Sequence, residues 1–240
     1  MGTYAAKISE IIQEAPQVKL IRLSFQELKS FKFLPGQFVM IGHSELKGET
    51  GLPVQRAFSV ASAPSQKDYL ELCVKIVEGG KFSKICRGLK KNDTVEVKGP
   101  FGKFHLPQDH KNDYAFFAGG TGVAPLMSML HELKKDRFPV KVVLFFTFRE
   151  PQDYLYKKEL EEMNTTYSNF TLVTTCTSKQ PAGWEGMKGR FTVDEIKKFI
   201  QDPNKRMHYI CGNNDFVSSI KSYLAALEVS QENIHTEAWG

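Results

Sequence analysis

The stretch Asp113-Tyr-Ala-Phe-Phe-Ala-Gly-Gly-Thr-Gly-Val-Ala-Pro125 decides how the rest of the chain is interpreted. Its first part, Tyr114–Ala118, is a short apolar run that ends in glycines, which is typical of a strand buried on both faces of a parallel sheet. Leu126–Lys135 follows with apolar residues at helical spacing. A strand, a glycine turn and a helix in this order offer free backbone N–H groups and a positive helix dipole. The stretch therefore predicts a seat for a diphosphate.

The residues of this turn define the predicted contacts. Gly120, Thr121 and Gly122 supply a tight turn and bare backbone that a ligand can approach. Pro125 lies in the first helical turn, where a missing N–H group does no harm. Pro125 also replaces the third glycine of the usual dinucleotide fingerprint, so the generic motif is only partly present. A purely structural glycine turn is the alternative interpretation.

Bulk properties narrow the classes of protein to consider. With 41% hydrophobic residues, the 240-residue chain can form packed cores in one large domain or two smaller ones. No apolar run is long enough to span a membrane and Met1–Lys7 has no signal pattern, so we expect a cytoplasmic protein without membrane insertion. The four cysteines form no Cys-x-x-Cys pair, which predicts buried free thiols and no metal site. A net charge of +5 is too small to indicate nucleic-acid binding.

The first hundred residues carry the pattern of short strands separated by turns. The expected strands are Thr3–Ile12, Val18–Phe25, Gly36–Ile41, Arg56–Ser62, Leu70–Ile76 and Thr94–Lys98. One helix is expected, at Phe82–Leu89. Short strands at this spacing predict a small antiparallel β-barrel.

After the polar link Leu106–Asn112, strands alternate with helices. The expected strands are Tyr114–Ala118, Val140–Thr147, Phe170–Thr175, Met207–Cys211 and Asn233–Glu237, and helices are expected to begin near Pro125, Asp153, Thr192 and Asn214. This alternation predicts a parallel sheet covered on both faces. The expected fold therefore has two domains: an antiparallel β-barrel over residues 1–108 and an α/β domain with a parallel sheet over residues 109–240.

The sequence Arg56-Ala57-Phe58-Ser59 is the second informative stretch. Arginine offers forked donors for a phosphate, an aromatic ring offers a stacking surface, and serine offers a small hydroxyl. On a strand, Arg56 and Phe58 share one face, and Ser59 points the other way unless the chain bends. An edge strand with an exposed arginine and a core phenylalanine is the alternative.

Together these motifs resemble the ferredoxin-NADP reductase family. The glycine turn is similar to its pyridine-nucleotide loop, and Arg56–Ser59 is similar to its Arg-x-Tyr-Ser flavin signature, with Phe58 in the tyrosine position. The resemblance implies a barrel that binds FAD and an α/β domain that binds NADPH or NADH. It implies that Arg56 holds the flavin diphosphate, Phe58 stacks on the isoalloxazine and Ser59 bonds near flavin N5. Without the phenol hydroxyl, one hydrogen bond to the flavin is lost and the stacking surface remains.

Two further segments extend the flavin side of the resemblance. Leu72–Lys75 resembles the strand that lines the adenosine, with Val74 and Lys75 as contacts. Gly80-Lys81-Phe82-Ser83 resembles the turn whose backbone amides hold the diphosphate, which favours FAD over FMN. From the residues alone, Ser83 is equally suited to cap the following helix.

The resemblance to the family also covers residues of the nucleotide-binding site, which lie at the ends of the predicted strands. The family places Cys211, followed by Gly212, beside the nicotinamide, and it has an acid and an aromatic ring at the positions of Glu237 and Trp239. The resemblance implies that Cys211 shapes the pocket, Glu237 assists proton balance and Trp239 covers the flavin. For Cys211 and Trp239, packing alone is the alternative.

The signals for NADH or NADPH conflict. Arg149 follows a predicted strand and is a candidate for adenosine phosphate or ribose, and Ser178 with Lys179 for a 2′-phosphate. Gly189-Arg190 after Trp184 resembles segments of NADH-linked members. Exposed surface is the alternative for each, and the preference stays open.

The expected activity is the transfer of hydride from NAD(P)H to FAD, followed by passage of the electrons to a carrier such as ferredoxin or flavodoxin. The predicted barrel carries many basic residues, which form either a solvated basic face, the simpler interpretation, or a docking site for an acidic carrier such as ferredoxin or flavodoxin: Lys81, Lys84, Arg87, Lys90, Lys91, Lys98 and Lys103. The alternatives are a reductase component for an oxygenase or for free flavins, a non-catalytic electron-transfer or nucleotide-sensing subunit, and a plain nucleotide-binding module. We expect a monomer.

Overall fold

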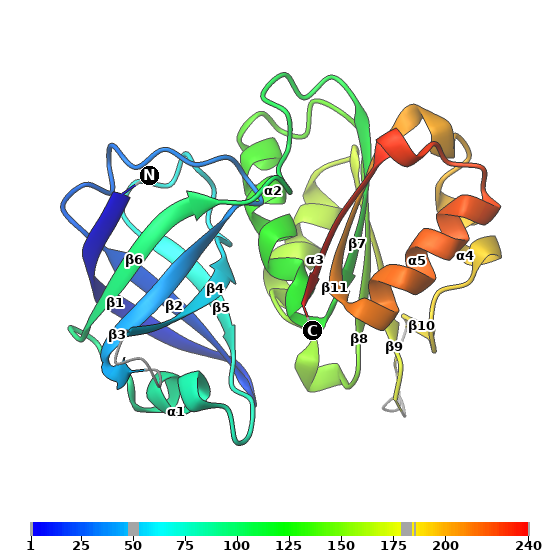
Figure 1. The fold of residues 1–240 in the computed structure, drawn as a ribbon. Coiled ribbons are helices and arrows are strands. Elements are labelled where there is room, and N and C mark those ends of the chain that lie inside the picture. The colour runs from blue at the N-terminus through cyan, green and yellow to red at the C-terminus, as the bar shows by residue number, and fades with distance from the viewer. Residues whose placement is uncertain (1, 48–52, 179–183, 185, 240) are drawn as a thin grey trace. The chain divides into compact units, whose positions relative to one another are not determined.

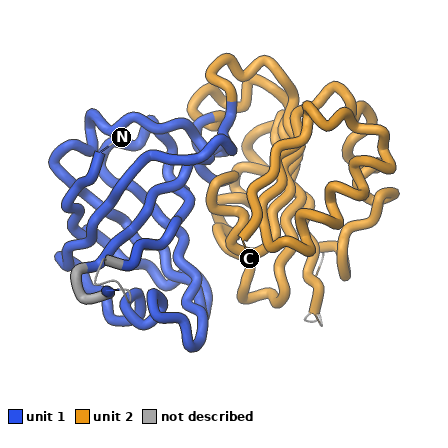
Figure 2. The backbone as a smooth tube through the Cα atoms, in the orientation of Figure 1, with its two compact units in different colours: residues 1–106, 127–132 blue, residues 107–126, 133–240 orange. Residues whose placement is uncertain are grey.

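The structure is a computed structural model that describes residues 2–47, 53–178, 184 and 186–239. It divides into two compact units (Figure 2). Unit 1 comprises residues 1–106 and 127–132, and unit 2 comprises residues 107–126 and 133–240. The short stretch 127–132 belongs to a helix that the sequence assigned wholly to the second domain.

In unit 1, the described part of residues 1–106 forms six antiparallel strands and the helix α1 (Lys81–Gly88). The strands are β1 (Gly2–Ala15), β2 (Val18–Ser24), β3 (Phe38–Lys47), β4 (Pro53–Ser59), β5 (Leu70–Lys75) and β6 (Thr94–Phe101), in the order β4-β3-β6-β1-β2-β5. The outer strands meet where Val60 pairs with Leu72 and the Ala61 N–H group donates to the Glu71 carbonyl at 2.8 Å. This junction closes the sheet into the barrel seen in Figure 1.

The barrel interior follows from the alternation of side chains along each strand. In β6, Val95 and Val97 are buried, whereas Thr94, Glu96 and Lys98 between them are exposed. Helix α1 adds Phe82 and Cys86 to the same core. An amphipathic pattern of this kind is what the sequence analysis used to predict the barrel.

Unit 2 is built on six parallel strands. They are β7 (Asp113–Gly119), β8 (Val142–Phe148), β9 (Phe170–Cys176), β10 (Met187–Lys188), β11 (Arg206–Asn213) and β12 (Ile234–Trp239), in the order β10-β9-β8-β7-β11-β12. Because β7 and β8 are buried along almost their whole length, they carry continuous apolar runs. The helices are α2 (Val123–Lys135), α3 (Lys157–Thr166), α4 (Val193–Phe199) and α5 (Asn214–Ala226). Figure 1 shows α4 and α5 on one face of the sheet and α3 on the other.

The predicted fold class is confirmed, and the differences are local. The strand expected at Arg56–Ser62 ends at Ser59, because the chain leaves the ladder after the Val60 bridge. The helix expected near Asp153 begins only at Lys157, because Tyr156 has a left-handed backbone with φ of 54°. The two-residue strand β10 was not predicted.

The expectation of free, buried cysteines is confirmed. All four cysteines are free and buried. No helix within the described ranges is long and apolar enough to cross a membrane.

Candidate functional site

The end of β4 holds the predicted flavin-binding residues. Arg56 is exposed, Ala57 and Phe58 are half-buried, and Ser59 is buried opposite Phe38 of β3. The Ser59 hydroxyl oxygen is inaccessible to solvent and has no hydrogen-bond partner among the described residues. A buried hydroxyl group without a hydrogen-bond partner is unfavourable unless a bound ligand forms a hydrogen bond with it. A polar atom of a bound ligand would satisfy this hydroxyl group, and its assignment to the flavin stays a prediction.

The start of α1 lies beside this strand. The rings of Phe58 and Phe82 have centroids 5.6 Å apart. Gly80 is the N-cap of α1 and provides no side-chain cap, so the first-turn N–H groups, from Lys81 onward, are suited to an anion. The alternative that Ser83 caps the helix is wrong: its hydroxyl accepts the Val77 N–H group at 2.9 Å.

The other two predicted flavin contacts lie at the end of β5. Lys75 is the last residue of the strand and is exposed. Val74 has its side chain in the barrel core, which leaves only its backbone for a ligand.

The predicted nucleotide turn lies at the topological switch point of unit 2. The chain runs outward from β7 through β8, β9 and β10, and then returns to β11 on the other side of β7. Ligands of parallel sheets bind at the carboxyl ends of the strands where this reversal occurs. The turn Gly120–Gly122 follows β7 at this place and leads directly into α2.

The glycines of the turn have distinct structural roles. A Cβ atom on Gly122 would lie 2.2 Å from the Cys211 carbonyl oxygen, so the turn packs directly on β11. Gly120 has φ of 53° and open space where a Cβ atom would be, which leaves its backbone accessible to a ligand. Thr121 is half-buried, and Pro125 lies in the first turn of α2, as predicted. No side chain caps the start of α2 among the described residues.

Phe216 at the start of α5 is a part of this site that the sequence analysis missed. Its ring lies 2.7 Å from the position that a Cβ atom on Gly212 would take and 3.0 Å from that on Gly119. Asn213 caps α5 by accepting the Phe216 N–H group at 2.8 Å. The sequence signal was available: Gly212-Asn213 repeats the pattern of a buried strand, a glycine and a helix start.

Strands β11 and β12 bring together the three predicted residues near the carboxyl end of the chain. Their register pairs Cys211 with Glu237 and Asn213 with Trp239. Burial, reinforced by the Glu237 charge, raises the pKa of the Cys211 thiol well above its usual range. Cys211 is therefore a neutral packing group at physiological pH and not a thiolate nucleophile.

The candidate adenosine contacts lie at the ends of β8 and β9. The Ser178 N–H group donates to the Arg149 carbonyl at 2.9 Å, and the Arg149 side chain is exposed. Trp184 donates its indole N–H group to the Met187 carbonyl at 3.0 Å. Lys179 lies outside the described residues. No set of three or more His, Cys, Asp or Glu residues in the described part of the chain is arranged to hold a metal ion.

Two family models match the chain in the order of its two units. Residues 5–106 match the oxidoreductase FAD-binding domain, and residues 116–222 match the oxidoreductase NAD-binding domain. The chain belongs to the oxidoreductases that combine an FAD-binding domain with an NAD-binding domain. The glycine turn, α2 and most of β11 and α5 fall within the second match, and β4 falls within the first.

Individual relatives are similar to the chain over both of its units. The chain is 29% identical over 242 residues to the glycine betaine monooxygenase reductase subunit of Pseudomonas aeruginosa (strain UCBPP-PA14), covering 100% of this chain and 65% of the relative. It is 28% identical to the terephthalate 1,2-dioxygenase reductase component 1 of Comamonas sp., covering 98% and 68%. The crystal structure of a ferredoxin NADP+ reductase from Neisseria gonorrhoeae with bound FAD and NADP has the same fold, with a TM-score of 0.83, 22% identity and 99% of each chain covered. The chain thus spans about two thirds of the length of the oxygenase reductases that it matches.

Proposed function

We propose that this protein is a flavoenzyme that takes a hydride from NAD(P)H onto bound FAD and passes the electrons to a separate acceptor. The observation that carries the proposal is the buried Ser59 hydroxyl, which has no partner among the described residues and lies at the end of the strand that carries Arg56 and Phe58. FAD supplies the redox chemistry, and the protein supplies binding, orientation and electrostatics. Orientation of this kind can contribute on the order of 7 kcal/mol or more to lowering a barrier.

On the flavin side, each residue has a proposed task. Arg56 donates to the diphosphate, together with the first-turn amides of α1 from Lys81 to Ser83. Phe58 provides the stacking surface and is supported by its contact with Phe82. Ser59 bonds the polar edge of the flavin ring.

On the nucleotide side, the turn Gly120–Gly122 and the first turn of α2 receive the diphosphate. Cys211, neutral and buried, shapes the nicotinamide pocket with Gly212. Arg149 and Ser178 are the proposed contacts to the adenosine phosphate or ribose. Proton balance by Glu237 and coverage of the flavin by Trp239 stay predictions.

The direct test is a visible spectrum of the purified protein, followed by anaerobic titration with NADH and NADPH in parallel. We expect a flavin spectrum that bleaches with at least one of the two nucleotides. FAD rather than FMN is expected on extraction, because α1 offers amides for a second phosphate. A colourless protein that takes up no added FAD would refute the proposal.

For the acceptor, we propose an acidic electron carrier such as a ferredoxin or flavodoxin. The seven basic residues expected near the flavin are all exposed: Lys81, Lys84, Arg87, Lys90, Lys91, Lys98 and Lys103. Complementary charge accelerates association of such partners. The printed names of the relatives favour a second candidate, delivery of electrons to an oxygenase component. Turnover with ferredoxin, flavodoxin, free flavin and a purified oxygenase component, measured side by side, separates these candidates from one another.

A further inference from the structure

We propose that Ser128, His131 and Glu132 of α2 are positioning residues that fix the Ser59 hydroxyl for the flavin. They act on the exit segment, which we define as Ala61–Ser65, the residues that follow the end of β4. The inference rests on the proposed function in one respect, that β4 binds the flavin. It assigns a second task to the helix whose first turn is the proposed diphosphate site.

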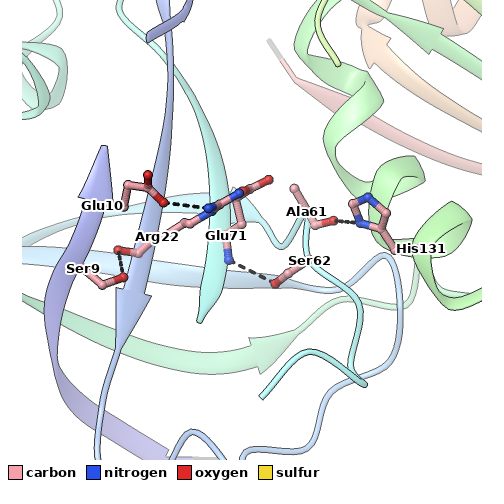
Figure 3. A network of polar contacts seen from close by, with 7 residues as sticks. All are labelled: Ser9, Glu10, Arg22, Ala61, Ser62, Glu71 and His131. Carbon is pink, nitrogen blue, oxygen red and sulfur yellow. Dashed lines mark hydrogen bonds and ion pairs between the residues drawn. The ribbon is translucent and has the colours of Figure 1, made fainter. Parts of the chain in front are cut away.

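The barrel holds only the beginning of the exit segment. The Ala61 N–H group donates to the Glu71 carbonyl at 2.8 Å, and the Ser62 hydroxyl accepts the Glu71 N–H group at 3.0 Å. Glu71 itself is fixed by Arg22, whose Nε donates to its carboxylate at 2.8 Å. Figure 3 shows this chain of contacts from Arg22 to Ser62. The contacts just described use the Ala61 N–H group and the Ser62 hydroxyl, and they do not involve the carbonyl groups of these two residues.

Helix α2 supplies partners for these groups. His131 Nδ1 bonds the Ala61 carbonyl at 3.0 Å, as Figure 3 shows. The Ser128 hydroxyl donates to the Ser62 carbonyl at 2.7 Å, and the Ser65 hydroxyl donates to the Glu132 carboxylate at 3.1 Å. Positions 128, 131 and 132 are spaced i, i+3 and i+4, so they share one face of the helix. One helix face therefore bonds three residues of the exit segment.

The burial of these groups makes the contacts specific. Ser128 is fully buried between the fully buried Met127 and Met129, and Ser62 is 4% exposed. A hydroxyl in such surroundings is unfavourable unless it is hydrogen-bonded. Because the Ala61 carbonyl is an acceptor only, His131 must donate from Nδ1. Neutral and protonated His131 can both do so, and the contact does not depend on its protonation.

The same helix also contacts the segment that leads into β3, the strand that pairs with Ser59. Met129 packs against Gly36, where an added Cβ atom would lie 2.4 Å from its methyl carbon. Gly36 is followed by Gln37, whose carbonyl accepts the Val60 N–H group at 3.0 Å, and by Phe38, the register partner of Ser59. Helix α2 thus contacts the chain on both sides of the β4 end. Since the Ser59 hydroxyl has no partner among the described residues, its position is set by this backbone.

A double-mutant cycle tests whether Ser128 acts through Ser59. Flavin reduction by saturating NADH (or NADPH, if that is preferred) is followed by anaerobic stopped flow in Ser59→Ala, Ser128→Ala and the double variant. We expect each single variant to be slower by about fivefold, the equivalent of one hydrogen bond, and the double variant to be no slower than Ser59→Ala. Ser222→Ala is the matched control, because Ser222 lies on α5 and donates to the carbonyl of Ser218 in its own helix. Multiplicative slowing in the double variant would overturn the proposal.

A second pair of variants tests the contact independently of turnover and of the folding of Ser128→Ala. In His131→Asn, the side-chain amide keeps a donor close to the position of Nδ1, and in His131→Ala it is lost. The dissociation constant of FAD is measured by fluorescence during reconstitution of the apoprotein. We expect His131→Ala to weaken FAD binding about fivefold and His131→Asn to stay within twofold of the wild type. Equal binding in both variants, or equal loss in both, would overturn the proposed contact. A wild type that takes up no FAD would instead overturn the proposed function, and this inference with it.

Discussion

Ser59 places a hydroxyl group in a dry position of unit 1, where it has no described partner. In the absence of a ligand this group opposes folding, because its bonds to water are lost and not replaced. With a ligand that bonds it, the same group contributes affinity and orientation. Function and stability therefore make opposite demands on this side chain.

The first prediction follows from this opposition. Ser59→Ala should leave the free energy of unfolding of the apoprotein unchanged or raise it by up to about 1 kcal/mol, because an unbonded buried hydroxyl is removed. The same variant should slow flavin reduction while the dissociation constant of the nucleotide stays unchanged. Urea unfolding and anaerobic stopped flow measure the two effects. An unchanged rate of flavin reduction would contradict the assigned role.

The second prediction compares two glycines in one turn. Gly122→Ala should destabilise unit 2 by several kcal/mol, because its Cβ atom would lie 2.2 Å from the Cys211 carbonyl oxygen. Gly120→Ala should cost only about 1 kcal/mol, since its φ of 53° disfavours a side chain but the space is open. Gly120→Ala should nevertheless bind NADH and NADPH more weakly, because the added methyl occupies the side left for the ligand. Thermal unfolding and nucleotide titration distinguish the two variants. Equal destabilisation by Gly122→Ala and Gly120→Ala would refute the proposed difference in how closely the two glycines are packed.

At the scale of elements, β11 carries a pH-sensitive group away from the proposed chemistry. His208 is fully buried, its ring stacks on Phe117, and Nε2 bonds the Pro203 carbonyl at 2.8 Å. Burial lowers the pKa of His208 below 6.5, and the positive charge of Arg206 adds to this effect. Below pH 6.5 the unfolded chain therefore binds a proton that the folded chain resists. The contribution of neutral His208 to the free energy of unfolding is therefore complete above pH 6.5, and it is lost as the pH falls.

The third prediction is that His208→Gln, which can keep a donor to Pro203, reduces this pH dependence. Wild-type stability should fall between pH 6.5 and 5.5 by at most about 1.4 kcal/mol per pH unit from this group. Urea unfolding at pH 7.5, 6.5 and 5.5 measures the slope in both proteins. Asp202 does not affect the slope in this pH range. The hydrogen bond from Arg206 lowers the pKa of Asp202 below 3.8, so the contribution of this carboxylate to the free energy of unfolding is lost only in stronger acid. If the free energy of unfolding depends on pH equally in the variant and the wild type, a group other than His208 causes the dependence.

The elements also show what sequence patterns can and cannot predict. Strand β7 and the end of helix α2 were predicted closely, because a buried parallel strand and an amphipathic helix have strong patterns; α2 begins at Val123, before the predicted start near Pro125. The start of α3 was misplaced because the left-handed Tyr156 has no local sequence signal. Strand β10 was missed because two residues are too few for any period.

The same limit applies to the candidate site. The glycine turn and Arg56–Ser59 are local motifs, and the sequence identified both. Ser128 and His131 were not identified, because their partners lie 66 and 70 residues away along the chain. Contacts of this kind depend on the tertiary fold and leave no periodic pattern.

At the scale of the whole molecule, the charge distribution matters for the acceptor. The fourth prediction is that reduction of an acidic ferredoxin or flavodoxin slows as ionic strength rises, whereas reduction of a small neutral quinone does not. The double variant Lys84→Glu/Lys91→Glu, with both positions exposed on unit 1, should lower the rate with the protein carrier by several-fold. The control is Lys158→Glu on α3, which changes an exposed lysine of unit 2. A rate with either carrier that is independent of salt would refute electrostatic docking.

Helix α2 has a practical consequence for redesign of the protein. Its first turn is the proposed diphosphate site, and its side chains from Ser128 to Glu132 bond the exit segment beside Ser59. If the flavin binds at the end of β4 as proposed, substitutions in this helix that are meant to change the nucleotide preference should also weaken flavin binding. Efforts to convert the enzyme between NADH and NADPH should begin at Arg149 and Ser178 instead, where a backbone hydrogen bond joins the ends of β8 and β9.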